Sequence, residues 1–156
     1  KGIECIHAAI EARDVRTVKI DSESAASYAP DVDLDHVHYD DYDLLIIPGG
    51  TVNTDLLRQH PKTLEIIQSF SNQAKPIAVI CHAPWVLINA ERIQAKQLTS
   101  HKSIRLDLEN AGAIWVDEAV HTCNAGGWTL ISSRSSEDLP PFNQAILKEL
   151  ESNSSI

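Results

Sequence analysis

Two adjacent residues, Cys81 and His82, place a nucleophile beside a base at a point where the local pattern of the chain changes. Residues 76–80 form an apolar run that predicts a buried strand, and Pro84 suits the first turn of a following helix. A cysteine at such a junction lies beside the free N–H groups and partial positive charge of the helix N-terminus, which favour the reactive thiolate. We therefore predict a nucleophile elbow that carries sulfur in place of the serine oxygen.

Other interpretations of these residues stay open from the sequence. Cys81 is also of a type that packs as a small buried apolar side chain, and His82 could be a structural histidine that bonds to backbone groups. His101 follows the predicted strand 98–100 and would reach the same edge of the sheet. It is therefore a second candidate base.

The elements that must position these residues alternate between strands and helices. Strands are predicted over 15–20, 44–47, 76–80, 98–100, 114–120 and 128–132, helices over 1–14, 55–72 with a break at Pro61, 85–90, 103–111 and 142–150, and an irregular acidic excursion over 21–42. This alternation implies an α/β sandwich around a mostly parallel sheet. Ligands gather at the carboxyl ends of such strands. The turn at Gly49 and Gly50 and the residue Cys81 each follow the carboxyl end of a predicted strand, so we expect them to lie close together.

Composition excludes several classes of protein. The 156 residues include 22 acidic against 13 Lys and Arg, a net charge of −9, which argues against a nucleic-acid or anionic-membrane partner. We expect one domain over 1–156, with no membrane helix and no signal peptide. Three cysteines are too few for a disulfide framework, so a reducing, cytoplasmic setting is expected. Cys5 is predicted in a helix and Cys123 in a loop, neither with a functional context.

A metal site is weakly indicated at one place. His36 and His38 lie among aspartates, but their spacing matches no strong zinc pattern. We expect no metal and no cofactor.

Several segments, taken together and in this order, resemble the ThiJ/PfpI family, and most closely its PfpI-type branch of intracellular cysteine peptidases and stress proteins. The similarity extends over about residues 15–151. The segments are Ile46-Ile47-Pro48-Gly49-Gly50, Ala78-Val79-Ile80-Cys81-His82-Ala83-Pro84-Trp85, Leu98-Thr99-Ser100-His101, Asp107-Leu108-Glu109-Asn110-Ala111-Gly112-Ala113, Ser132-Ser133-Arg134 and Glu137-Asp138-Leu139-Pro140.

The resemblance implies a flavodoxin-like three-layer sandwich related to class I glutamine amidotransferases. It implies that Cys81 is the nucleophile, that His82 is its neighbour in the elbow, and that the backbone N–H groups of Gly50 and His82 form the oxyanion hole. His101 carries over as an alternative partner, because in another branch the histidine at this place approaches the cysteine.

The resemblance also implies a homo-oligomer, a dimer or higher. In PfpI-type members an acidic residue after the Pro-Gly-Gly turn orients the histidine of an adjacent subunit, and the matching residue here is Asp55. A helix N-cap is the equally open alternative for Asp55.

Two places depart from the family pattern. The opening strand and the acidic loop that supplies a glutamate near the cysteine are not intact, so Glu4 is the candidate remnant of that motif and His7 its rival. We expect that residues of this strand are missing from the sequence. Ala83 replaces a usual glycine, and its methyl group could cramp the elbow.

The leading functional hypothesis is a cysteine-dependent hydrolase with peptidase, deglycase or glyoxalase-like activity on a small-molecule or peptide substrate. Each of these reactions begins with attack of the Cys81 thiolate on an electrophilic carbonyl carbon. The alternatives are a non-catalytic stress-response, redox-sensing or chaperone-like protein with an oxidisable Cys81, and a degenerate family member that serves as a binding module.

Overall fold

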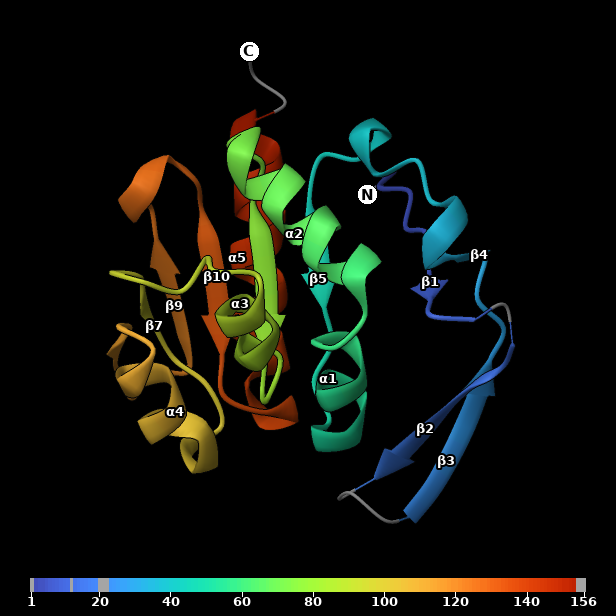
Figure 1. Ribbon diagram of the computed structural model, residues 1–156, viewed down its shortest axis with the longest axis horizontal. Helices are drawn as coiled ribbons and strands as arrows, with labels where there is room; N and C mark the ends of the chain where they lie inside the picture. Colours follow the sequence, from blue (N-terminus) through green and yellow to red (C-terminus); the bar gives the residue numbers. More distant parts are fainter. Residues whose placement is uncertain (1, 12, 20–22, 154–156) are drawn as a thin grey trace. The chain divides into compact units, whose positions relative to one another are not determined.

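The computed structural model describes residues 2–11, 13–19 and 23–153, which form two compact units (Figure 1). One unit covers residues 1–39 and the other residues 40–156. The expectation of a single domain over 1–156 stays a prediction.

The first unit consists of two small strand pairs. Strand β1 (Ala8–Ala9) is parallel to β4 (Val32–Asp33), and β2 (Val15–Lys19) is antiparallel to β3 (Glu23–Tyr28). The β-branched run of β2 forms the strand that the sequence predicts, while residues 20–22 lie outside the described residues. The acidic excursion over 21–42 is less irregular than expected, because β3 supplies the partner that β2 needs.

The helix predicted over residues 1–14 is wrong for the part of it that the structure describes. The backbone carbonyl of His7 accepts hydrogen bonds from Asp31 N (2.8 Å) and Val32 N (3.4 Å), so the segment is paired as extended chain. Ile3 and Ile6, which suggested a helical face, are both exposed. Cys5 is exposed and lies in no helix.

The second unit is built on a four-stranded sheet in the order β5 (Leu45–Ile47), β6 (Ile77–Ile80), β10 (Leu130–Ser133), β9 (Val120–Cys123). Strands β5 and β10 run parallel to β6, and β9 runs antiparallel to β10. The sheet is therefore mostly parallel, as predicted. All four residues of β6 are buried, which explains why its sequence is continuously apolar.

Helices cover both faces of this sheet (Figure 1). The helices are α1 (Thr51–Leu57), α2 (Pro61–Asn72), α3 (Pro84–Asn89), α4 (Arg105–Asn110) and α5 (Leu139–Asn153). Helix α5 packs on β10 and β9, whereas α2 packs on β6 and α3. Pro61 and Pro84 each occupy the start of a helix, where a missing N–H costs nothing. The result is the predicted flavodoxin-like, three-layer α/β architecture.

The core beneath α5 fixes the sheet from that side. Ala78 and Ile80 of β6 and Ile131 of β10 pack with Phe142 and Ile146 of α5. The other short strands, β7 (Gln97–Leu98) and β8 (Ile114–Trp115), form a separate parallel pair. Within the described residues, no helix combines the length and apolar character needed to cross a membrane.

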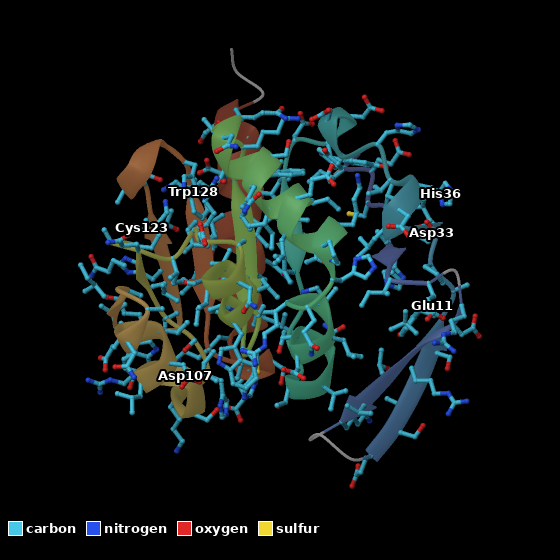
Figure 2. All side chains as sticks on the ribbon, in the orientation of Figure 1. Glu11, Asp33, His36, Asp107, Cys123 and Trp128 are labelled. Carbon is cyan, nitrogen blue, oxygen red and sulfur yellow. The ribbon has the colours of Figure 1, made fainter. Side chains whose placement is uncertain are left out.

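A buried lysine braces the turn between β9 and β10. The Lys96 side chain donates from Nζ to the carbonyl oxygens of Ala125 and Trp128 (2.7 Å to the latter), and it lies 3.6 Å from the centre of the Trp128 ring. Lys96 is 2% exposed, and this burial lowers its pKa to about 8. Cys123, labelled in Figure 2, is a buried residue of β9 rather than the predicted loop thiol.

We expect this lysine to make stability depend on pH in the alkaline range. Between pH 8 and the ordinary lysine pKa of 10.5, the unfolded chain binds more protons than the folded chain, so the free energy of unfolding rises with pH. The rise at this site amounts to at most about 3 kcal/mol. Urea unfolding at several pH values should show this rise in the free energy of unfolding in the wild type and not in Lys96→Met. Lys102→Met, at an exposed lysine, is the control and should keep the wild-type rise. If the free energy of unfolding changes equally with pH in the wild type and in Lys96→Met, the lowered pKa of Lys96 is refuted.

Candidate active site

Cys81 follows β6 directly and adopts a left-handed backbone conformation, with φ at +65°. A residue with a Cβ atom rarely occupies this region unless its surroundings hold it there. The Cys81 N–H donates to the carbonyl of Ser133 on β10 (3.0 Å), and its carbonyl accepts from His101 N (2.9 Å). The sharp turn that the sequence predicts at this junction is therefore present and is held from two sides.

The glycine turn after β5 lies against Cys81, as predicted. A Cβ atom added to Gly49 would lie 2.6 Å from the Cys81 Cβ and 2.9 Å from the Ile80 carbonyl oxygen, so no larger residue fits. Gly50 is the N-cap of α1 and has φ at +95°, a conformation that favours glycine. Gly50, whose N–H is a predicted donor of the oxyanion hole, therefore directly follows Gly49, the residue that lies against Cys81.

His82 and Cys81 are brought together. The Nδ1 atom of His82 lies 3.1 Å from the Cys81 Sγ, and its Nε2 atom lies 3.0 Å from the hydroxyl of Ser103. The His82 ring stacks on His101, with centroids 4.7 Å apart and an interplanar angle of 21°, and its centroid lies 5.5 Å from that of Trp85. His82 is 8% exposed, so neighbouring groups largely fix its orientation.

His101 joins the site through a serine. It caps the 3₁₀ helix η3 (Lys102–Ile104), and its Nδ1 accepts from Ser103 N (3.3 Å) and lies 2.7 Å from Ser103 Oγ. The structure thus connects the two predicted histidines by one hydroxyl. Sequence reasoning missed Ser103, for which the available signal is a hydroxyl residue two positions after His101.

Asp55 lies inside α1, which begins after Gly50, so the N-cap alternative is wrong. Its carboxylate accepts from Arg58 Nε (3.0 Å) and Gln59 Nε2 (3.2 Å). The Arg58 guanidinium lies 5.1 Å from the ring centre of Trp85, whose indole N–H donates to Asp107. Within this chain, Asp55 is thereby linked through Arg58 to Trp85, which packs beside His82.

Glu4 and His7 belong to the first unit, where Glu4 is exposed, and their proposed relation to the cysteine stays a prediction. Ala83 is fully buried and has ordinary helical dihedral angles (φ −52°, ψ −31°). The backbone at this position therefore does not require the glycine that is usual in the family pattern.

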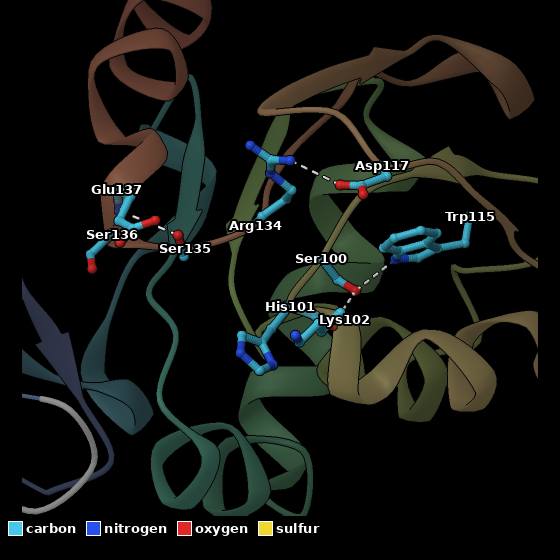
Figure 3. Close-up of a pocket in the computed structure, with 9 residues that line it drawn as sticks. All are labelled: Ser100, His101, Lys102, Trp115, Asp117, Arg134, Ser135, Ser136 and Glu137. Carbon is cyan, nitrogen blue, oxygen red and sulfur yellow. Dashed lines mark hydrogen bonds and ion pairs between the residues drawn. The ribbon is translucent and has the colours of Figure 1, made fainter.

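A cavity of about 470 Å³ opens beside His101, between Lys102, Trp115, Arg134 and Glu137 (Figure 3). Arg134 forms ion pairs with Asp117 (2.9 Å) and with Asp138 (2.9 Å). These carboxylates raise the pKa of Arg134, and the guanidinium lowers the pKa of Asp138. The cavity wall therefore carries fixed charges of both signs next to a candidate catalytic histidine.

The weak metal motif has another explanation. The Nδ1 atom of His36 lies 2.6 Å from the Asp33 carboxylate, which lowers the pKa of Asp33. Among the described residues, no group of three His, Cys, Asp or Glu side chains is arranged to hold a metal ion.

Comparison with known proteins assigns the sequence to a family. A model of the DJ-1/PfpI family matches residues 2–149. The chain belongs to the DJ-1/PfpI family.

Curated relatives within the DJ-1/PfpI family carry several functional names. General stress protein 18 of Bacillus subtilis is 38% identical over 91% of this chain and 80% of its own length. Protein/nucleic acid deglycase 2 of Escherichia coli is 36% identical over 90% of this chain and 79% of its own. Putative cysteine protease YraA of Bacillus subtilis is 39% identical over 71% of this chain and 63% of its own.

Solved structures agree with the DJ-1/PfpI assignment. A two-domain protein from Anabaena variabilis with DJ-1/ThiJ/PfpI-like and ferritin-like domains superposes with a TM-score of 0.74 at 36% identity. Drosophila melanogaster DJ-1beta gives a TM-score of 0.72 at 29% identity. The match to the Anabaena protein covers 81% of this chain and 35% of that protein. The match to DJ-1beta covers 80% of this chain and 65% of that protein.

The close contact at Gly49 leads to a test of the elbow in this DJ-1/PfpI chain. Gly49→Ala should force Cys81 or the Ile80 carbonyl to move, at a cost of about 1–3 kcal/mol, because overpacking at a rigid contact is not absorbed locally. Iodoacetamide labelling of Cys81, followed by peptide mass spectrometry, should slow at least severalfold.

Gly127→Ala is the matched control, since an added Cβ at Gly127 meets nothing within 4 Å. It should cost only the strain of its positive φ and leave the labelling rate of Cys81 unchanged. A Gly49→Ala protein that labels as fast as the wild type would contradict the close-contact account.

Proposed function

We propose that this DJ-1/PfpI chain is a cysteine-dependent, hydrolase-like enzyme that acts on an electrophilic carbonyl carbon. Cys81 is the nucleophile and His82 is its base. The observation that carries the proposal is the 3.1 Å separation between Cys81 Sγ and His82 Nδ1 at a residue held in a left-handed turn. Covalent catalysis needs a nucleophile and a base within hydrogen-bond reach of each other, and a further group that orients the base.

The chemistry follows from these positions. His82 Nδ1 takes the thiol proton, and the Cys81 sulfur then forms a bond to the carbonyl carbon while the C=O electron pair moves to oxygen. The backbone N–H groups of Gly50 and His82 are the proposed donors to that oxyanion. Collapse of the tetrahedral adduct breaks the bond to an amine, which leaves with the proton held by His82, and water hydrolyses the remaining thioester.

The substrate class is proposed from the cavity and from the names of relatives. A space of about 470 Å³ beside His101 is in the range that holds small molecules or a few peptide residues. The relatives named deglycase and putative cysteine protease support a substrate in which a carbonyl carbon is joined to an amine. A glyoxal-type aldehyde would use the same attack without an amine leaving group.

We further propose that the chain forms a homo-oligomer through α1. Val52 and Leu56 lie four residues apart on this helix and are 74% and 55% exposed, which gives an apolar stripe beside Asp55. A second copy seated on this stripe would bring Asp55 close to a neighbouring subunit. Asp55, now bound to Arg58 and Gln59, would then be available to orient the histidine of that partner.

A redox-sensing protein is the second candidate. Cys81 is only partly buried and contacts a histidine, which are conditions that also favour oxidation of a thiol, and one relative is named a general stress protein. In this reading, peroxide converts Cys81 to sulfinic acid and no carbonyl substrate turns over.

We expect Cys81→Ser to reduce turnover at least about a thousandfold, because the serine hydroxyl ionises far less readily than a thiol at neutral pH. The assay uses three probes: a fluorogenic peptide, glyoxal, and a glyoxal-modified amine. Cys5→Ser is the matched control and should retain wild-type rates, since Cys5 is exposed in the first unit. Full activity in Cys81→Ser would end the hydrolase proposal, and peroxide oxidation without turnover of any probe would favour the sensor.

The oligomer proposal has a separate test. Val52→Glu combined with Leu56→Glu should lower the mass measured by analytical ultracentrifugation, because charges on the stripe oppose its burial. Leu106→Glu is the control, as Leu106 is 65% exposed on a different helix, α4. A wild type that sediments as a monomer at micromolar concentration would contradict the proposal.

A further inference from the structure

The hydroxyl of Ser103 lies between the two histidines of the site. Its oxygen is 3.0 Å from His82 Nε2 and 2.7 Å from His101 Nδ1. The next contact along the line is His82 Nδ1 to Cys81 Sγ, at 3.1 Å. A continuous series of polar contacts therefore runs from the sulfur through two imidazoles and one serine.

The backbone sets the direction of this series. Ser103 N–H donates to His101 Nδ1 (3.3 Å), so that nitrogen is an acceptor and carries no proton. The Ser103 hydroxyl then donates to the same nitrogen and has its lone pairs left to accept. The atom that faces those lone pairs is His82 Nε2, which must therefore be the protonated nitrogen of a neutral His82.

We propose that Ser103 is a positioning residue that fixes the Nε2–H tautomer of His82 and so directs its Nδ1 lone pair at the Cys81 thiol. This inference rests on the proposed function for the role of His82 as base. In the step concerned, the S–H bond breaks and an Nδ1–H bond forms, which leaves a thiolate beside an imidazolium. The imidazolium keeps its Nε2–H bond to Ser103, so the serine stabilises both states.

The two rings of the stack face different partners. The centroids of His82 and His101 are 4.7 Å apart. The Nδ1 atom of His101 faces Ser103, whereas the Nδ1 atom of His82 lies 3.1 Å from Cys81 Sγ. His82 is thereby the histidine of the pair that is placed to accept the proton from Cys81.

The charged groups around the stack come from several elements, and each remains when Ser103 is replaced. Asp55 and Arg58 of α1 lie on one side through Trp85, and Asp107 of α4 holds the Trp85 indole. Lys102, with the Asp117–Arg134 ion pair, lines the cavity beside His101. A difference between wild type and a Ser103 variant therefore reports the hydroxyl.

Ser103→Ala should slow alkylation of Cys81 by iodoacetamide at pH 7 about tenfold and move the midpoint of its rate–pH profile upward by about one unit. The effect is moderate because Ser103 is exposed and water can replace part of the bond. Ser103→Thr keeps the hydroxyl and should restore both values. Ser152→Ala, whose hydroxyl bonds within α5, is the control and should match the wild type.

A second readout follows the tautomer directly. In ¹⁵N-histidine NMR spectra of Cys81→Ala, which lacks the thiol, neutral His82 should be protonated at Nε2. Adding Ser103→Ala should shift the signals toward a mixture of tautomers, and adding Ser103→Thr should not. The Cys81→Ala background removes the sulfur, so this result does not depend on any turnover.

The outcomes separate this inference from the proposed function. If Ser103→Ala leaves the alkylation profile of Cys81 and the tautomer of His82 unchanged, the role of Ser103 is overturned. The enzyme proposal still stands in that case if Cys81→Ser abolishes turnover. A changed profile and tautomer, restored by threonine, would support Ser103 even if none of the three carbonyl probes turned over.

Discussion

The left-handed conformation of Cys81 is the constraint around which the second unit is arranged. Its N–H is bound by β10, its carbonyl is bound by His101, and Gly49 approaches its Cβ so closely that no other residue fits. Each of these neighbours comes from a different segment, so the strained backbone is held by the whole sheet edge rather than by local sequence. The sulfur is presented at the carboxyl end of β6, where an open parallel sheet collects ligands.

The second level of organisation is the set of side chains that fix the imidazole of His82. Ser103 contacts its Nε2, the His101 ring stacks on one face, and Trp85 packs beside it. Trp85 is in turn held by Asp107 and by Arg58. A base that must meet a thiol at one nitrogen needs its other nitrogen and its ring plane fixed, and these contacts supply both. The contact between Cys81 and His82 thus joins the two residues that the sequence analysis proposes as nucleophile and base.

Much of the second unit could be predicted from sequence because its signals are local. A continuous apolar run predicts β6, and Pro61 and Pro84 mark the beginnings of two helices. For Ser103 the sequence offers only a weak signal, a hydroxyl residue two positions after His101. Its place between two histidines that lie nineteen positions apart (82 and 101) arises only when the chain folds. The helix predicted over residues 1–14 is wrong in the part that the structure describes, where Ile3 and Ile6 are exposed, because a 3.6-residue period stabilises a helix mainly when the apolar face is buried.

Ionisation of Cys81 tests the account most directly. The measurement is the ultraviolet absorbance of the thiolate across a pH titration, taken as the difference between wild type and Cys81→Ser so that Cys5 and Cys123 cancel. The account predicts that the sulfur is already largely anionic at neutral pH, paired with a charged His82. A difference signal that appears only at or above about pH 8.5, the value of an ordinary thiol, would contradict it.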